Sequence, residues 1–415
     1  MASASSYDLN SYCEPIASHG ATERVNGRPP NLLYLTYEYL PTLGGVQRSV
    51  QNLANTFVRR QYSVTIVANR DAGVSYEREL PVPVLGMPIP TAFHHSATEK
   101  LRTSSRDMVN LFVLAALCVR KKVDLVHCHL VNVDTRYAVA LKRMLGVKMV
   151  LTLRGGEFSH WIKGWPNRRA YVRRMLEAAD VVTALSRSQI EDARRLAPEL
   201  PWGRAEVITN PVNPDEVARL ASGGSVSGHG SNSYIVFCGR LANEKRIDTL
   251  IEAYHRVINQ CPHYAHDLLI AGTGSMMETL LRKARRGPGG RRIRFLGRCS
   301  YEDTLAVIRD AAVLVLPSQE SEGCPNVVIE AMALGTPVIV SDHAPLRELV
   351  THGVNGEVFP VGNASALAQR LLDMSRNPGK LSHYSLAGKN HVMQEHRFDQ
   401  VSMAYDRVYR SIIAG

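Results

Sequence analysis

The stretch AAVLVLPSQESEGCPNVVIEAMALGTPVIVSD, residues 311–342, holds two short apolar runs on either side of a segment with helical spacing. The runs AAVLVLPS and TPVIVSD are rich in valine, isoleucine and leucine, as are strands buried on both faces of a parallel sheet. Between them, the apolar residues with the spacing of one helix face are Val327, Val328, Ala331 and Leu334. Because parallel strands need a crossover connection, the stretch predicts a strand, a helix and a second strand in succession.

The same alternation extends over most of the chain. Ahead of this stretch come the runs YIVFCGR, HDLLIAGTG and IRFLGR, and earlier still LLYLTYEY, YSVTIVAN, VDLVHCH, VKMVLTL and ADVVTALS. The pattern predicts an α/β fold of two doubly wound, Rossmann-like domains, which bind ligands beyond the carboxyl ends of their strands. We expect the two domains to face each other across a cleft that forms the active site.

A Gly/Ser-rich stretch, residues 221–233, interrupts the alternation and has the composition of a flexible connection. It places the boundary between the two domains. The predicted segments are a loosely ordered leader at 1–30, an N-terminal Rossmann-like domain at 31–210, a linker at 211–233, a C-terminal Rossmann-like domain at 234–395 and a C-terminal helix at 396–415 that packs back on the N-terminal domain.

Composition bounds the class of protein. The chain has 415 residues and is 45% hydrophobic, which suits two globular domains. The chain has 49 lysines and arginines and 38 aspartates and glutamates, which gives a net charge of +11. Nucleic acid, anionic lipid and a phosphorylated small molecule are all compatible with this charge. Seven scattered cysteines without a C-x-x-C pair indicate neither a disulfide framework nor a zinc site, and favour a reducing, cytoplasmic location.

The N-terminal residues lack the charged and apolar regions of a secretory signal. The longest apolar candidate for a membrane segment, MVNLFVLAALCV at residues 108–119, is too short to span a bilayer. We therefore expect it to form a buried helix.

Two cations precede a predicted helix in GRLANEKRIDTLIEAYHRV. Gly239 and Arg240 follow directly on a predicted strand, and Lys245 comes five residues after Arg240. Such cations suit a diphosphate, because the amide donors and the helix dipole add to the side-chain charge. The alternative is a solvated basic turn.

Two glutamates eight residues apart flank the start of the next predicted helix, near Pro325. We expect Glu322 on the loop before the helix and Glu330 one or two turns inside it, with both carboxylates directed toward a ligand over the helix start. There they can accept hydrogen bonds from sugar hydroxyls. The alternative is that Glu322 caps the helix and Glu330 is a surface residue.

These motifs resemble one family. G-R-x4-K, the E-x7-E pair inside P-S-x-x-x-E-G-x-P-N-V-V-x-E-A-M-A-x-G-x-P-V-I, and an early P-x-x-G-G-V-Q are similar to the GT-B glycosyltransferases of family 4, the large retaining class. The resemblance implies transfer of a hexose from a UDP- or GDP-linked sugar to a hydroxyl of a sugar, lipid-linked glycan or small-molecule acceptor. It also implies that no cofactor and no metal are needed, and no D-x-D motif occurs in the chain.

By this resemblance the catalytic residues are Glu322, Arg240 and Lys245. The two cations would neutralise the leaving diphosphate, where charge develops during transfer. Glu322 would hold the hydroxyls of the transferred sugar, and Glu330 the ribose. The remaining donor contacts implied are Gly45, Gly239, Gly272, Gly274, Leu296, Gly297, Gly323, Cys324 and Asn326.

Some of these donor positions have a plainer interpretation. Gly272, Gly274, Leu296 and Gly297 fall where the base of the nucleotide packs in the family. Ordinary turns at strand ends are the alternative.

Acceptor contacts are expected from the N-terminal half. Gly44 lacks a Cβ and allows close approach of a ligand. His127 and His129 end a predicted strand, with a core or capping histidine as the alternative for each. Arg154 and Glu157 stand where many relatives carry a His-Gly or His-Asp pair, which puts a catalytic histidine there in doubt and suggests that this arginine and this glutamate contact the acceptor.

Two basic segments remain. Residues 160–174, HWIKGWPNRRAYVRR, combine aromatic and cationic side chains, so they indicate either peripheral contact with an anionic membrane or a solvated basic helix. Residues 282–294 lack interleaved aromatics and predict a loop face rather than a nucleic-acid site. The alternatives to a transferase are a nucleotide-sugar epimerase of the same architecture and a non-catalytic nucleotide-sugar-binding subunit.

Overall fold

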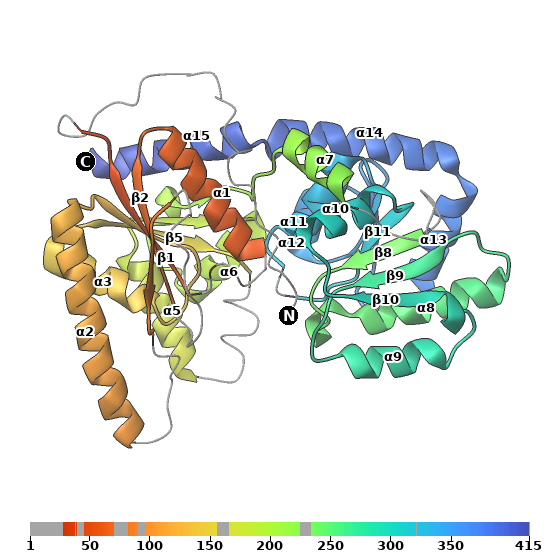
Figure 1. The fold of residues 1–415 in the computed structure, drawn as a ribbon, viewed down its shortest axis with the longest axis horizontal. Coiled ribbons are helices and arrows are strands. Elements are labelled where there is room, and N and C mark those ends of the chain that lie inside the picture. The colour runs from red at the N-terminus through yellow and green to blue at the C-terminus, as the bar shows by residue number, and fades with distance from the viewer. Residues whose placement is uncertain are drawn as a thin grey trace. The chain divides into compact units, whose positions relative to one another are not determined.

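The computed structural model describes residues 28–37, 39, 45–69, 82–89, 97–155, 166–224, 234–320 and 322–414. The chain divides into two compact units. The first comprises Met1–Thr152, Met175–Val181 and Arg407–Gly415, and the second comprises Leu153–Arg174 and Val182–Asp406. Each half of the chain is built on a parallel sheet flanked by helices, as the apolar runs predict (Figure 1).

The first sheet has the strand order β3-β2-β1-β4-β5-β6-β7 in the described part of the chain. Five of the six residues of β1 are buried, because the strand lies between β2 and β4. The strands are β1 Asn31–Thr36, β2 Ser63–Asn69, β3 Val84–Met87, β4 Leu125–Cys128, β5 Lys148–Leu153, β6 Val181–Ala184 and β7 Glu206–Val207. The helices in this part of the sequence are α1 Gly45–Arg59, α2 Ala97–Lys121, α3 Thr135–Leu145, α5 Pro166–Ala178 and α6 Arg187–Leu196.

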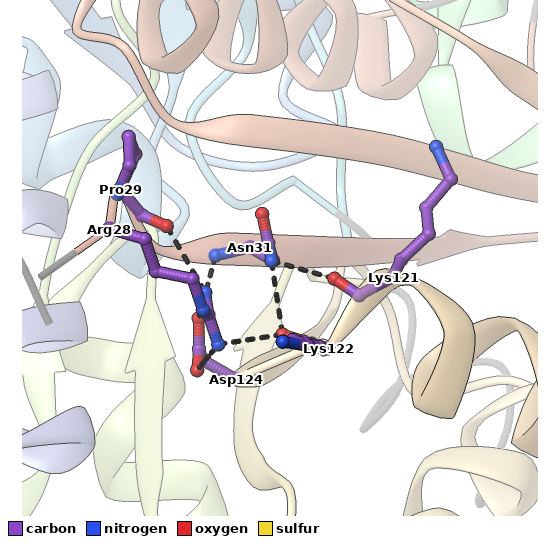
Figure 2. Close-up of polar contacts among 6 residues, drawn as sticks. All are labelled: Arg28, Pro29, Asn31, Lys121, Lys122 and Asp124. Carbon is purple, nitrogen blue, oxygen red and sulfur yellow. Dashed lines mark hydrogen bonds and ion pairs between the residues drawn. The ribbon is translucent and has the colours of Figure 1, made fainter. Parts of the chain in front are cut away.

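The start of β1 is fixed to the turn between α2 and β4 (Figure 2). The Arg28 guanidinium donates to both carboxylate oxygens of Asp124, each at 2.8 Å. The same carboxylate accepts the Asn31 amide at 2.7 Å, while the Asn31 side chain donates to the Lys121 carbonyl at 2.6 Å. This network holds the first strand in register with β4.

Helix α2 departs from the sequence prediction. Residues 108–119 were expected to form a buried helix, and one face of the segment is indeed buried, with Leu114 and Leu117 in the core. The opposite face is exposed, including Met108 and Phe112. The expectation was wrong because an apolar composition does not say how many sides of a helix are covered.

The second sheet has the order β10-β9-β8-β11-β12-β13. Its strands are β8 Tyr234–Cys238, β9 Asp267–Ala271, β10 Ile293–Gly297, β11 Val313–Leu316, β12 Val338–Ser341 and β13 Glu357–Phe359. All neighbouring strands pair in parallel. The helices of this part are α8 Ile247–Gln260, α9 Met277–Arg285, α10 Tyr301–Arg309, α11 Asn326–Leu334, α12 Ala344–Leu349, α13 Ala364–Arg376 and α14 Pro378–Glu395.

The expected linker at 211–233 contains a helix, α7, at Pro214–Gly223. Asn213 caps it by accepting hydrogen bonds from the amides of Asp215 and Glu216, at 3.2 and 3.3 Å. Arg309 of α10 donates to the Ala221 carbonyl at 2.6 Å. Most of the described part of this segment is therefore folded and packed, and the compact units do not divide there.

The last helix, α15, runs over Phe398–Ile413. Residues 407–415 belong to the first unit. The Tyr409 hydroxyl lies 3.1 Å from that of Tyr34 on β1 and 2.6 Å from Nδ1 of His127 on β4. The end of the chain thus completes the core of the first unit.

Candidate functional site

The predicted donor residues of the second unit gather at one edge of its sheet. Gly239 follows β8, Gly272 follows β9, and Glu322 lies beyond the end of β11. Because these neighbouring strands are parallel, their carboxyl ends lie on the same side. This is the edge at which doubly wound sheets bind ligands.

The turn after β8 carries the two cations. Lys245 ends a short 3-10 helix, Asn243–Lys245, and α8 begins two residues later. The Arg240 side chain is largely exposed and pairs with the carboxylate of Glu244 at 2.7 Å. Arg246, between the 3-10 helix and α8, adopts the left-handed conformation at φ 49°.

Lys245 meets Glu322. Its Nζ donates to Oε1 of Glu322, and the hydroxyl of Ser318 donates to the same oxygen at 2.6 Å. Glu322 is 7% exposed, so this carboxylate is withdrawn from bulk water and held by two donors. Removing Lys245 is costly because it leaves the buried charge of Glu322 unmatched.

Further contacts fix the turn after β8 against the loop after β11. The Gln319 amide donates to the Glu244 carbonyl at 2.9 Å, and Arg246 donates to the Gln319 side chain at 3.0 Å. Arg246 also pairs with Asp248 at 3.0 Å. The turn after β8, with Lys245, and the loop after β11, with Glu322, are therefore fixed to each other as one assembly. Electrostatic catalysis requires charged groups that are held in place in this way.

Glu330 lies inside α11, which begins at Asn326 directly after Pro325. It is 7% exposed and accepts a hydrogen bond from the Tyr301 hydroxyl at 2.8 Å. The helix start has no side-chain cap. Both plainer alternatives, a capping Glu322 and a surface Glu330, are thus wrong.

Glycines allow the strand-end turns to pack against one another. A Cβ on Gly272, where φ is 137°, would stand 1.8 Å from the Gly239 carbonyl oxygen, and one on Gly274 would stand 2.3 Å from that of Leu241. The Gly272 amide donates to the Gly297 carbonyl at 2.7 Å. Close backbone packing at strand ends accounts for Gly272 and Gly274, whereas Leu296 is half-buried against the core.

Arg154 reaches the loop of the predicted donor residues through Asn210. Its Nη1 donates to Asn210 Oδ1 at 3.2 Å, and Asn210 Nδ2 donates to the Cys324 carbonyl at 2.7 Å. Burial raises the pKa of the Cys324 thiol to about 12, so the thiol stays protonated. Cys324 therefore contributes its backbone rather than a nucleophile.

The backbones on either side of this contact lie close together. A Cβ on Gly323 would stand 2.6 Å from the Arg154 carbonyl oxygen, and one on Gly155 would stand 2.9 Å from the carbonyl carbon of Glu322. A side chain at either position would push these segments apart. The loop of the predicted donor residues Glu322, Gly323 and Cys324, called the donor loop below, thus depends on small residues on both of its sides.

The other acceptor candidates divide into two groups. Gly44 and Glu157 lie outside the described residues. The donor candidate Gly45, next to Gly44, is the first residue of α1. His127 is fully buried, with Nδ1 on Tyr409 and Nε2 on Thr152, both at 2.6 Å. The prediction that His127 lines an acceptor pocket is wrong, because both ring nitrogens serve the core.

His129 is buried too, and its ring lies against that of His127, with centroids 3.8 Å apart and the ring planes tilted by 34°. The structure brings the two rings together beneath Tyr34, whose ring lies 4.6 Å from that of His129. Both histidines are therefore core residues, which was the alternative to an acceptor pocket.

Several residues of the assembly were not singled out from the sequence. Ser318 lay within the quoted P-S-x-x-x-E motif, but a serine at a strand end carries no distinctive signal. Asn210 and Arg246 likewise have no pattern that marks them. His343, at the N-cap of α12, is a fourth: burial lowers its pKa, and the nearby charge of Glu322 opposes that shift.

Within the described ranges, no group of three or more His, Cys, Asp or Glu residues is arranged to hold a metal ion. None of the described helices is both long and apolar enough to cross a bilayer.

The fold and the strand-end site define the class of GT-B glycosyltransferases. Residues 43–216 match the family described as Glycosyltransferase Family 4, and residues 232–377 match the family described as Glycosyl transferases group 1. The chain belongs to these group 1, family 4 glycosyltransferases.

Relatives with assigned activities cover most of the chain. It is 27% identical over 379 residues to phosphatidyl-myo-inositol mannosyltransferase of Mycobacterium leprae, spanning 89% of this chain and 93% of the relative. It is 22% identical over 307 residues to N-acetyl-alpha-D-glucosaminyl L-malate synthase of Bacillus anthracis, spanning 72% and 78%.

Solved structures share the fold. Anabaena HepE in complex with UDP and glucose superimposes with a TM-score of 0.74 at 16% identity, over 92% of this chain and all of that one. Sucrose-phosphate synthase from Thermosynechococcus elongatus gives a TM-score of 0.75 at 19% identity, over 93% and 99%. The GT-B architecture predicted from the sequence is confirmed.

Proposed function

We propose that this glycosyltransferase moves a hexose from a UDP- or GDP-linked sugar to a hydroxyl of a sugar, lipid-linked glycan or small-molecule acceptor, with retention of anomeric configuration. The observation that carries the proposal is the pairing of Lys245 with the buried Glu322 at the carboxyl ends of β8 and β11. A nucleotide-sugar donor is supported by the HepE complex with UDP and glucose.

The cations act on the leaving group. When the bond between the sugar and the diphosphate breaks, negative charge grows on the departing phosphate oxygens, and Lys245 and Arg240 stabilise that charge. Because the Arg240 side chain is largely exposed, its pair with Glu244 is worth at most about 1 kcal/mol. Its guanidinium can therefore exchange that carboxylate for a phosphate.

The carboxylates orient the donor. Glu322, already held by Lys245 and Ser318, accepts hydrogen bonds from the hydroxyls of the transferred sugar. Glu330, in the first turns of α11, accepts hydrogen bonds from the hydroxyls of the ribose. The amides of Gly323, Cys324 and Asn326 face the sugar or the phosphate, where the start of α11 favours negative charge.

The proposal includes activity without a metal ion and a cytoplasmic location. The six described cysteines are all free thiols, which is compatible with a reducing compartment. Full transfer activity in excess EDTA supports metal independence, and loss of activity that Mg²⁺ or Mn²⁺ restores overturns it.

Contact of residues 160–174 with an anionic membrane, one of the two alternatives that the sequence leaves open, also stays a proposal. Residues 160–165 lie outside the described part, and α5 begins at Pro166. Arg169 on this helix is exposed.

The proposal is tested by screening donors and then following the product. UDP, GDP, ADP and their sugars are compared by thermal shift, since a ligand raises the melting temperature with the logarithm of its saturation. The sugar nucleotide that stabilises most is then incubated with and without acceptors, and the product is analysed by mass spectrometry and NMR. An α-linked product from an α-linked donor supports the proposal, whereas an epimerised sugar nucleotide in the absence of acceptor overturns it in favour of an epimerase.

A further inference from the structure

Helix α2 carries an exposed apolar face that the glycosyl-transfer site does not use. The side chains of Met108, Val109 and Phe112 are 69%, 62% and 76% exposed, and Val113 and Val119 are exposed as well. Side chains of this kind are normally scattered singly over a surface. Here Met108, Val109, Phe112 and Val113 lie within about two turns of one helix, and Val119 follows about two turns later.

The helical spacing places these residues in one stripe, opposite the face that packs on the first unit. At 100° per residue, Met108, Phe112 and Val119 lie along one edge of the stripe, and Val109 and Val113 along the other. The buried side chains of Asn110, Leu114, Leu117 and Cys118 lie on the far side of the helix.

Cations border the stripe at both of its ends. Arg106 and Arg120 are exposed and lie on the same edge as Val109 and Val113. The acidic residue beside them, Asp107, is engaged on the other side of the helix, by Arg136 and by the Tyr137 hydroxyl, at 2.7 and 2.6 Å. The net charge next to the apolar stripe is therefore positive.

The neighbouring helix α3 packs on the side of α2 that faces away from the stripe. The contacts of Asp107 with Arg136 and Tyr137 hold α2 and α3 side by side, as Figure 1 shows. Both helices end just before parallel neighbouring strands, β4 and β5, so their C-terminal ends lie at the same edge of the sheet. There α3 exposes Arg143, Met144 and Leu145, which are not counted as part of the stripe.

We propose that the exposed face of α2 docks on an anionic lipid bilayer. An interfacial helix has its apolar side chains in the boundary of the acyl chains and its cations at the level of acidic headgroups, which this stripe and its arginines match. A second copy of the chain is the other candidate occupant. It fits less well, because two such stripes packed together would bring Arg106 and Arg120 of both copies close to one another.

The test is sedimentation of the full chain with vesicles. Vesicles of phosphatidylglycerol and phosphatidylcholine are compared with pure phosphatidylcholine at low salt, for the wild type, Phe112→Asp and Leu386→Asp. Leu386 is the matched control, because it is a large apolar residue 64% exposed on α14. Far-UV circular dichroism and the thermal midpoint verify that each variant is folded.

We expect the wild type and Leu386→Asp to bind the anionic vesicles. Phe112→Asp should bind them at least about tenfold more weakly. Three outcomes overturn the proposal: no binding by the wild type, equal binding by Phe112→Asp, or a concentration-dependent dimer in light scattering that Phe112→Asp alone abolishes. A second readout is quenching of tryptophan fluorescence by brominated lipids, measured against the wild type because the chain already has three tryptophans. Phe112→Trp should add to the quenched signal, and Leu386→Trp should not. Binding of UDP or GDP is unaffected in every case, so failure here is distinct from failure of the proposed transfer.

Discussion

Lys245 and Glu322, 77 positions apart in the sequence, form a part-buried ion pair at the carboxyl edge of the second sheet. The pair joins the turn after β8 to the loop after β11, and the contacts between Glu244, Arg246 and Gln319 hold the same two segments. A cation is thereby fixed beside a carboxylate before any ligand arrives. In the proposed reaction the cation faces the diphosphate and the carboxylate faces the sugar.

Removing either charge should abolish transfer. Lys245→Ala and Glu322→Gln are expected to lower kcat by about 10²–10³, the cost of deleting one preorganised electrostatic group. Steady-state kinetics with the best donor measures this. Glu395→Gln, an exposed glutamate at the end of α14, is the matched control. Wild-type turnover in folded Lys245→Ala or Glu322→Gln would remove these residues from the mechanism.

Asn210 should act as a positioning residue. Asn210→Ala removes its hydrogen bonds to Arg154 and to the Cys324 carbonyl, which costs about 1–3 kcal/mol of stability. Because Cys324 belongs to the donor loop, we expect KM for the donor to rise by more than kcat falls. Asn210→Asp, which keeps the acceptor for Arg154 but loses the donor to Cys324, should give the same donor defect. A normal donor KM in both variants speaks against this role.

Gly272 should not tolerate a side chain. Gly272→Ala places a Cβ on the Gly239 carbonyl oxygen in a backbone conformation with φ of 137°, so the turn after β9 must move. We expect a loss of about 3 kcal/mol or more in the free energy of unfolding, measured in urea. Gly379→Ala is the control, because open space surrounds that position at the start of α14. Equal stability of the two variants would contradict the described packing.

His396 should make stability depend on pH. Burial lowers the pKa of this side chain from 6.5 to about 4, while its Nδ1 lies 3.1 Å from the Asn210 carbonyl. Below pH 6.5 the unfolded chain takes up a proton that the folded chain resists, so stability is complete above pH 6.5 and falls toward pH 4. The loss amounts to about 3 kcal/mol.

The check is the urea midpoint between pH 4 and 7 for the wild type, His396→Asn and His383→Gln. The first variant should have a flatter pH profile, and the second, an exposed histidine on α14, should follow the wild type. Identical profiles for the wild type and His396→Asn would refute the assignment.

Local sequence predicted part of this architecture well. The α11 segment was identified because Pro325 and the spacing of Val327, Val328 and Ala331 all act within one helix, and Glu330 followed from it. Helix α7 was missed because its Asn-Pro start resembles a turn, although Asn213 is a good N-cap. Such helices are encoded by patterns within ten residues. The overall composition of a longer segment does not reveal these patterns.

Relations between distant segments could not be predicted. The link from Asn210 to Cys324 spans 114 positions, and that from His127 to Tyr409 spans 282. Nothing in the neighbourhood of either residue encodes its partner. For the same reason a histidine at a strand end, as in VHCHL, fits a pocket and a core equally well until the C-terminal helix is in place.

The central claim is that Lys245 holds a nucleoside diphosphate at the strand ends of the second unit. Isothermal titration of UDP and GDP into the wild type, Lys245→Ala and Glu395→Gln tests it most directly. One of the two nucleotides should bind the wild type and Glu395→Gln equally, and Lys245→Ala about tenfold or more weakly, as loss of a charge-assisted contact predicts. Equal affinity in all three proteins, or no binding of either nucleotide to the wild type, would contradict it.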